Sequence, residues 1–419
     1  MQAQTVYTLF LLFFAVSTLG QLYLSLRQSA AVRRHYGQVP AAFAATVSLA
    51  EHQTAADYTL AKQRLARYEI IFQAALLLLF TLGGGLNLLA LLSQKMLASP
   101  LWQGVLLIGL FTVVSTVLSW PFALYRTFRL EARFGFNRST AGTWLADQAK
   151  GALLLLVIGT PLLAAVIYVM GVMGNLWWLY VWLLWLGFSL LMLWAFPKWI
   201  APLFNRFEPL ADTDLQTRID ALLQRTGFQS KGVMVMDGSK RSGHGNAYFT
   251  GLGRNKRIVF YDTLLNNMQP DEVEAVLAHE LGHFAHKHIV KQMAVTFVLA
   301  LAVLYGLGLL LPQPAFYQGL GVQYPSHAMA LLLFLLVLPV FTFPFAPLAS
   351  LMSRRNEFEA DRFAARHTRA ADLIAALTKL YRSNAASLVT DGWYSRFYDS
   401  HPGAQERIAA LKRLYSRIK

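Results

Sequence analysis

The sequence predicts an α-helical polytopic membrane protein with seven transmembrane helices and a small α+β subdomain at one membrane face. The first observation is composition. Of 419 residues, 56% are hydrophobic and only 14% are charged, which is too apolar for an ordinary soluble domain. The second is a series of seven apolar runs of spanning length. The third is that only one long polar stretch, residues 198–287, interrupts them.

The seven apolar runs are expected to cross the bilayer at residues 6–23, 70–92, 101–125, 152–173, 176–196, 289–311 and 328–351. No basic segment precedes the first run and no small-residue cleavage site follows it, so we interpret it as a retained helix rather than a signal peptide. The second run contains three consecutive glycines, 83–85, and the last contains three prolines. Lipid tolerates such breaks where neighbouring helices cover the freed backbone.

Basic residues indicate the orientation. The loops after spans one, three and five are rich in Lys and Arg, whereas those after spans two, four and six contain almost none. The positive-inside rule therefore predicts an outside N-terminus and a cytoplasmic C-terminus. The net charge of +15 has the same explanation, and with no nucleic-acid-binding motif in the chain we expect the lipid bilayer, not nucleic acid, as its partner.

The polar stretch predicts a small mixed subdomain. Residues 214–226 form an amphipathic pattern typical of a helix, and residues 232–236, 247–250 and 257–261 are typical of short strands. A further helix follows from about Asp271. The chain has no cysteine, which excludes disulfides, a thiol nucleophile and a thiolate metal site.

This last helix contains His279-Glu280-Leu281-Gly282-His283, an H-E-x-x-H pattern. On a helix the two histidines are one turn apart and can hold one Zn²⁺ per chain. Glu280 lies about 100° round the helix, within reach of a water on that metal. A five-residue pattern with two free positions also arises by chance, so the pattern alone does not establish the site.

A catalytic zinc needs a third protein ligand. On a continuous helix His286 would lie about 10 Å along the axis from His279, and His288 would point to the far side, so we interpret both as ordinary interfacial histidines. Glu357 and Asp361 share a helical face further along, where Glu357 could bind the metal and Asp361 could accept the spare N–H of a ligand histidine. A solvated charged helix explains their spacing equally well.

Other segments join these in a common pattern: Phe134-Gly135-Phe136-Asn137, Pro202-Leu203-Phe204-Asn205, Gly238-Ser239-Lys240-Arg241-Ser242 with Asn246-Ala247-Tyr248-Phe249, Glu357-Phe358-Glu359-Ala360-Asp361, and Ser400-His401-Pro402 with Glu406-Arg407. Together with the H-E-x-x-H helix they resemble the integral-membrane CaaX prenyl protease type 1 family of zinc metalloendopeptidases. The resemblance implies a gluzincin-like peptidase subdomain and a chamber walled by the transmembrane helices. It also implies that His279, His283 and Glu357 bind zinc and that Glu280 is the base.

The resemblance assigns roles to further residues. His401 would donate a hydrogen bond to the oxyanion that forms during peptide cleavage. Arg407 would be an anchor by ion pairing and is counted with the substrate-binding residues. The strand Asn246, Ala247, Tyr248 and Phe249 would bind an extended peptide by backbone hydrogen bonds. A surface histidine and a plain structural strand are the alternatives that the residues themselves leave open.

The predicted topology brings the metal ligands together, because the H-E-x-x-H helix just precedes span six and Glu357 just follows span seven. We therefore expect four parts: residues 1–197, a cytoplasmic peptidase subdomain at 198–288, spans at 289–351, and a C-terminal helical part at 352–419.

The expected function is that of a zinc endopeptidase. Its peptide or protein substrates would be prenylated CaaX proteins, which it would cleave near their C-terminus. The alternatives are membrane-protein quality control and a non-catalytic scaffold or transporter with structural zinc. Compact loops point to a bacterial inner membrane.

Overall fold

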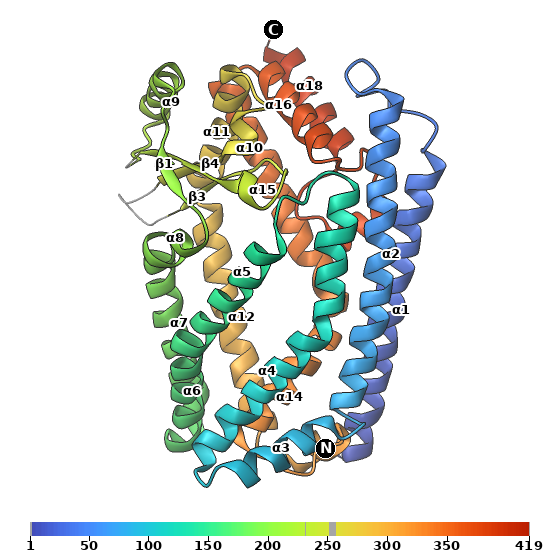
Figure 1. Ribbon diagram of the computed structural model, residues 1–419, viewed down its shortest axis with the longest axis vertical. Coiled ribbons are helices and arrows are strands. Elements are labelled where there is room, and N and C mark those ends of the chain that lie inside the picture. Colours follow the sequence, from blue (N-terminus) through green and yellow to red (C-terminus); the bar gives the residue numbers. More distant parts are fainter. Residues whose placement is uncertain (1, 231, 251–256, 419) are drawn as a thin grey trace.

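A computed structural model describes residues 2–230, 232–250 and 257–418. Long helices form a tall bundle, and shorter helices with a small sheet cover one end of it (Figure 1). The N-terminus lies at the far end of the bundle and the C-terminus lies at the covered end. The termini are therefore at opposite ends of the molecule, as an odd number of membrane crossings requires.

The helices of the bundle are α1 (Ala3–Arg34), α2 (Leu49–Phe80), α3 (Gly85–Met96), α4 (Pro100–Tyr125) with η1 (Arg126–Glu131), α5 (Ala141–Leu154) with η2 (Leu155–Gly159) and α6 (Thr160–Val172), η3 (Gly174–Leu176) with α7 (Trp177–Ala195), η4 (Phe196–Ile200) and α8 (Ala201–Phe204), α12 (His288–Leu310), α13 (Pro314–Gly319), and α14 (His327–Thr342) with η7 (Phe343–Phe345) and α15 (Ala346–His367). In the described residues six of these helices, joined where they are continuous, are long and apolar enough to cross a membrane. Counted together as one broken span, the bent pair α2 and α3 adds a seventh. The predicted count of seven spans is thus confirmed.

The boundaries differ from the predicted runs in two ways. Several helices extend beyond the apolar part, because a helix continues into water where packing supports it and hydropathy marks only the lipid-facing length. The second run is not one helix, because α2 and α3 meet at an angle of 54°. At this bend Gly84 has a φ of 79°, and a Cβ on Gly83 would lie 2.7 Å from the carbonyl oxygen of Leu79.

The bundle encloses a cavity of about 1060 Å³ bordered by α1, α2, α4, α12, α14 and α17. Most of its wall is apolar. A polar stripe lies on the side formed by α1 and α2, and its residues are Ser17, Thr18, Gln21, Ser25, Gln63, Glu69 and Gln73. The helix-walled chamber that the resemblance implies is therefore present, and it offers both an apolar and a polar surface.

The sheet at the covered end has the strand order β1-β2-β4-β3. Its strands are β1 (Phe207–Pro209), β2 (Val233–Met236), β3 (Ala247–Thr250) and β4 (Arg257–Tyr261). β2 and β4 are parallel, with Val233 opposite Ile258, while β3 pairs antiparallel with β4, with Ala247 opposite Phe260. The three predicted strands are present, and β1 was not predicted because three residues are too short to show an alternating pattern.

Helix α17 (Gly392–Tyr398) packs against α15 and α1 beside the cavity. The sheet is surrounded by α9 (Thr213–Thr226), α10 (Asp262–Leu265), α11 (Pro270–Ala285), α16 (Ala370–Ser383) and α18 (Ala404–Ile418). Their core is one cluster of buried apolar side chains, which includes Ile219, Phe260, Leu277, Leu373 and Leu411. The predicted parts 198–288 and 352–419 therefore share a single core, although two transmembrane spans separate them in sequence.

The last segments of the chain are also held to the first helices. Arg27 in α1 donates to Asp391 with a distance of 3.0 Å between its terminal nitrogen and Oδ2. The backbone N–H of Asp391 donates to Gln28 Oε1 at 2.7 Å. Arg382 in α16 pairs with Glu51 at the start of α2. The covered end is thus fastened to α1 and α2 by charged and polar contacts.

Candidate metal and catalytic site

The H-E-x-x-H residues lie on α11. This helix begins with Pro270 at its first turn and a capping box in which Gln269 and Glu272 exchange side-chain and backbone hydrogen bonds. His279 and His283 are one turn apart on the face toward α15, and His279 is buried. The predicted helix and its histidine face are therefore present.

Gly282 allows α11 to approach α15 closely. A Cβ at this position would lie only 2.8 Å from Ala360 Cα and 3.0 Å from Phe363 Cβ. The small side chain of Ala360 meets it from the other helix and is fully buried. This contact brings the histidines of one helix within reach of Glu357 on the other.

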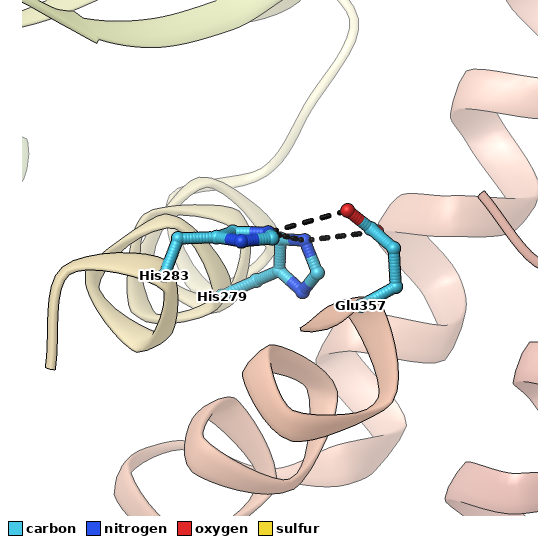
Figure 2. A group of neighbouring side chains, drawn as sticks. All are labelled: His279, His283 and Glu357. Carbon is cyan, nitrogen blue, oxygen red and sulfur yellow. Dashed lines mark hydrogen bonds and ion pairs between the residues drawn. The ribbon is translucent and has the colours of Figure 1, made fainter. Parts of the chain in front are cut away.

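Figure 2 shows the two imidazoles and the Glu357 carboxylate converging from these two helices. Nε2 of His279 lies 3.3 Å from Nε2 of His283 and 3.4 Å from Glu357 Oε2. Nε2 of His283 lies 3.3 Å from Glu357 Oε1. Atoms bound about 2.0–2.1 Å from one tetrahedral Zn²⁺ are about 3.3–3.4 Å apart, so the three ligands have the spacing that a single ion requires.

Two further features favour a cation at this position. Glu357 Oε2 is buried and makes no hydrogen bond within the described part of the chain. Burial alone would lower the pKa of His279, but the nearby carboxylates of Asp361 and Glu357 outweigh it and raise the pKa to about 9. The site therefore stabilises positive charge between its nitrogen and oxygen atoms.

Asp361 supports His279 from behind. Its Oδ1 lies 2.8 Å from His279 Nδ1, which is the contact that the spacing with Glu357 predicts. A carboxylate can only accept, so His279 Nδ1 carries a proton, and a metal that displaces the second proton of the ring binds through the Nε2 lone pair. Arg407 binds the same carboxylate through two nitrogens, at 2.6 and 3.0 Å.

Arg407 was expected among the substrate-binding residues, but its position in the structure does not fit that role. Its side chain is only 6% exposed, and its guanidinium lies against Asp361 and 3.4 Å from Glu357 Oε2. A peptide cannot reach a group buried in this way, which corrects the substrate contact. The ion-pair anchor that the resemblance implies agrees with the geometry.

Glu280 follows His279 on α11 and is half-buried at the edge of the ligand group. Burial raises the pKa of its carboxyl group, and the positive charges of His279 and His283 oppose this effect. A raised pKa brings a carboxylate closer to the basicity that a general base needs near neutral pH.

His401 reaches the site from the loop between α17 and α18. Its Nε2 lies 3.4 Å from Glu357 Oε1, and its Nδ1 lies 2.8 Å from the hydroxyl of Ser400. The side chain is 60% exposed, so it borders the metal ligands from the open side. This position suits a group that meets a substrate rather than one that completes the core.

The predicted substrate strand is β3, the end strand of the sheet. Phe249 points inward and packs against Phe284, the residue after His283, with ring centres 4.7 Å apart. Asn246 is exposed just before the strand. Among the described residues no strand pairs with the other edge of β3, so the backbone groups of that edge are available to a peptide.

The remaining motif segments meet one another. Arg241 binds both carboxylate oxygens of Asp147, at 2.7 and 2.8 Å, and donates to Asn205 Oδ1 at 2.6 Å. Asn137 forms an isolated β-bridge with Ser242. These contacts fasten the loop before β3 to the membrane helices and so fix the position of the strand.

The structure places His288 differently from the prediction. It is buried, and its Nδ1 lies 3.1 Å from His283 Nδ1. The prediction assumed one continuous helix, but α11 ends at Ala285 and Lys287 adopts a left-handed conformation with a φ of 55°. This turn starts α12 in a new direction and brings His288 back toward the site, whereas His286 is exposed.

Comparisons with known proteins agree with this geometry. A family model for the CAAX prenyl protease N-terminal part, with five membrane helices, matches residues 28–206. The model for peptidase family M48 matches residues 209–415, which include every ligand described above. The chain belongs to peptidase family M48. It is therefore a metallopeptidase and an integral multi-pass membrane protein.

Relatives in this family span most of the chain. It is 37% identical over 302 residues to the CAAX prenyl protease 1 homolog of Arabidopsis thaliana, covering 71% of this chain and 70% of the relative. CAAX prenyl protease 1 of Saccharomyces cerevisiae is 33% identical, covering 75% and 73%. The crystal structure of S. mikatae Ste24p has a TM-score of 0.91 and 28% identity, covering 98% of this chain and 99% of that one.

Proposed function

We propose that this M48 peptidase is a zinc-dependent endopeptidase that cleaves peptide bonds near the C-terminus of prenylated CaaX substrates at the cytoplasmic membrane face. The observation that carries the proposal is the group His279, His283 and Glu357, with its 3.3–3.4 Å spacing, beside Glu280 and the open edge of β3. The relatives named above, called CAAX prenyl proteases, support the substrate class.

The donor set supports zinc and a catalytic role for it. Two imidazole nitrogens and one carboxylate oxygen are a common catalytic zinc set. In the part of the chain that the structure describes, no fourth His, Cys, Asp or Glu joins the group. A structural zinc in a scaffold or transporter would have four protein ligands, so the three-ligand group favours an enzyme.

When bound, Zn²⁺ supplies a Lewis acid that polarises the scissile carbonyl and lowers the pKa of a water toward ~7. The protein residues do the rest. Glu280 takes the proton of the attacking water and passes it to the leaving amine. His401 donates a hydrogen bond to the oxygen on which negative charge develops. β3 holds the peptide extended through backbone hydrogen bonds.

The chamber supports a lipid-modified substrate. Its apolar wall suits an isoprenoid chain, and Tyr394 and Tyr398, which line it, lie only a few residues before His401. The alternative role is quality control, in which the substrates are unmodified membrane proteins, and the polar stripe of the chamber is compatible with it.

The positions of the termini at opposite ends and the basic loops support an outside N-terminus and an inside C-terminus. The compact loops favour a bacterial inner membrane as the location of the protein, whereas the relatives named above are eukaryotic.

The test uses the purified full chain with a farnesylated CaaX peptide, the same peptide without the lipid, and an unrelated unmodified peptide. We expect cleavage of the farnesylated peptide, and its loss on addition of a chelator. Efficient cleavage of the unmodified peptides instead would support quality control, and no cleavage with zinc bound would contradict the enzymatic proposal.

Glu280→Gln separates chemistry from metal binding. We expect it to abolish cleavage while zinc content stays near one per chain, because this carboxylate moves protons and does not bind the metal. His279→Ala, in contrast, should lower zinc content itself. An active Glu280→Gln variant would overturn the assignment of the base.

A further inference from the structure

The two metal-ligand histidines are supported in different ways. Behind His279 stands the carboxylate of Asp361, in direct contact at 2.8 Å. Behind His283 stands another imidazole: Nδ1 of His283 lies 3.1 Å from Nδ1 of His288. The far nitrogen of His288, Nε2, lies 2.9 Å from Glu359 Oε2. His283 therefore reaches a carboxylate through one intervening ring.

We propose that His288 and Glu359 form a relay that positions His283 and fixes the tautomer in which its Nε2 faces the metal site. Neither residue is one of the three metal ligands, and His288 acts only through His283, so both are positioning residues. The inference rests on the proposed zinc site and deepens it.

The chemistry of the groups fixes every proton in this chain. An ionised Glu359 can only accept, so His288 Nε2 must donate. In a neutral ring the other nitrogen is then an acceptor, so His288 Nδ1 accepts from His283 Nδ1. His283 Nε2 is left with a free lone pair, and this is the atom that lies 3.3 Å from Glu357 Oε1. In this arrangement His283 Nδ1 and both ring nitrogens of His288 each have a hydrogen-bond partner.

Burial makes the relay specific. His288 is 3% exposed, so solvent cannot replace its contact with His283. The rings of His283 and His288 stand nearly edge-on, with an interplanar angle of 73°. His288 is also the first residue of α12, and the left-handed turn at Lys287 aims it at the site. The relay therefore connects a metal ligand to the start of a membrane span.

The relay is weaker than the support of His279. Glu359 is 38% exposed at its side chain, whereas Asp361 is almost completely buried and is also bound by Arg407. Loss of a residue that supports a metal ligand typically costs 10- to 100-fold in metal affinity. We place Asp361→Asn and His288→Ala in this range, with Glu359→Ala at or below its lower end.

The test measures zinc affinity of the purified full chain by competition with a chelator, independently of activity. His288→Ala should bind zinc roughly 10- to 100-fold more weakly than the native chain. His288→Asn should recover most of this loss, because its Oδ1 occupies the place of Nδ1 and still accepts from His283. His35→Ala is the control, since this exposed histidine after α1 has the same chemistry and its ring bonds to the Ala31 carbonyl rather than to the relay, and it should bind zinc normally.

A double-mutant cycle tests the second link. Asn at position 288 cannot reach Glu359, so Glu359→Ala should weaken zinc binding in the native background and add nothing in the His288→Asn background. Native zinc affinity in His288→Ala would overturn the relay. An equal loss in His288→Asn and His288→Ala would also overturn it, because packing rather than the acceptor would then be responsible. If the native chain bound no zinc, the proposed function would fail instead.

Discussion

The metal centre and the membrane chamber are built on opposite principles. In the centre, Glu357, Asp361 and Arg407 are buried, and Arg407 and Asp361 bind each other in a two-pronged ion pair. In the chamber, the helices leave a cavity of about 1060 Å³ with polar side chains along one wall. The difference separates two tasks. A metal centre needs its ligands in fixed positions, which a network of buried hydrogen bonds and ion pairs provides. A chamber that accepts different substrate chains needs empty volume and few specific contacts.

The largest effect should come from breaking the cluster at Arg407. Arg407→Met leaves Asp361 and Glu357 buried without their positive partner, which typically costs about 3–5 kcal/mol. We expect a large drop in melting temperature and in zinc content. Arg362→Met on the exposed face of α15 is the control and should change the free energy of unfolding by no more than about 0.5 kcal/mol. Equal stability of the two variants would show that the cluster does not hold the site together.

The next effect should appear in catalysis alone. His401 lies at the open side of the cluster, so His401→Ala should leave stability and zinc content unchanged. If it donates to the developing oxyanion, kcat should fall by about 10²- to 10³-fold with KM little changed. Steady-state kinetics on the cleaved peptide measure both constants. A fully active variant, or one that lost its metal, would remove His401 from this role.

The smallest effect should come from the chamber wall. Gln73 faces the cavity and makes no hydrogen bond that the described residues show. Gln73→Leu should therefore change the free energy of unfolding by no more than about 0.5 kcal/mol and leave zinc affinity unchanged. Thermal unfolding and chelator competition test both expectations. A loss of zinc in this variant would mean that chamber and centre are coupled more closely than their packing indicates.

Sequence reasoning reached the features that depend on local periodicity. Apolar length identified the spans, and the four-residue spacings of His279 with His283 and of Glu357 with Asp361 placed each pair on one helical face. Topology then put both pairs at the same membrane face, where α11 and α15 do meet. These predictions hold in the folded protein because helix geometry determines which residues share a face, independently of tertiary contacts.

The features that were missed depend on single backbone torsions or on contacts distant in sequence. Lys287, with a φ of 55°, lies between the end of α11 and the start of α12, and its side chain gives no indication in the sequence that the backbone is left-handed there. The wrong placement of His288 follows from it. The burial of Arg407 was equally hidden, because an arginine near the end of a basic chain is usually solvated and only its contacts with Asp361 and Glu357 show otherwise.

The contact between Arg27 and Asp391 has a consequence for the order in which the protein is assembled. The two residues are 364 positions apart, so Arg27 lacks its carboxylate partner until the segment that carries Asp391 has been synthesised. All three metal ligands have been synthesised by residue 357, yet α1 and α2 still lack the partners that fasten the covered end to them. In order of synthesis, the complete set of metal ligands therefore precedes the contacts that hold the covered end against α1 and α2.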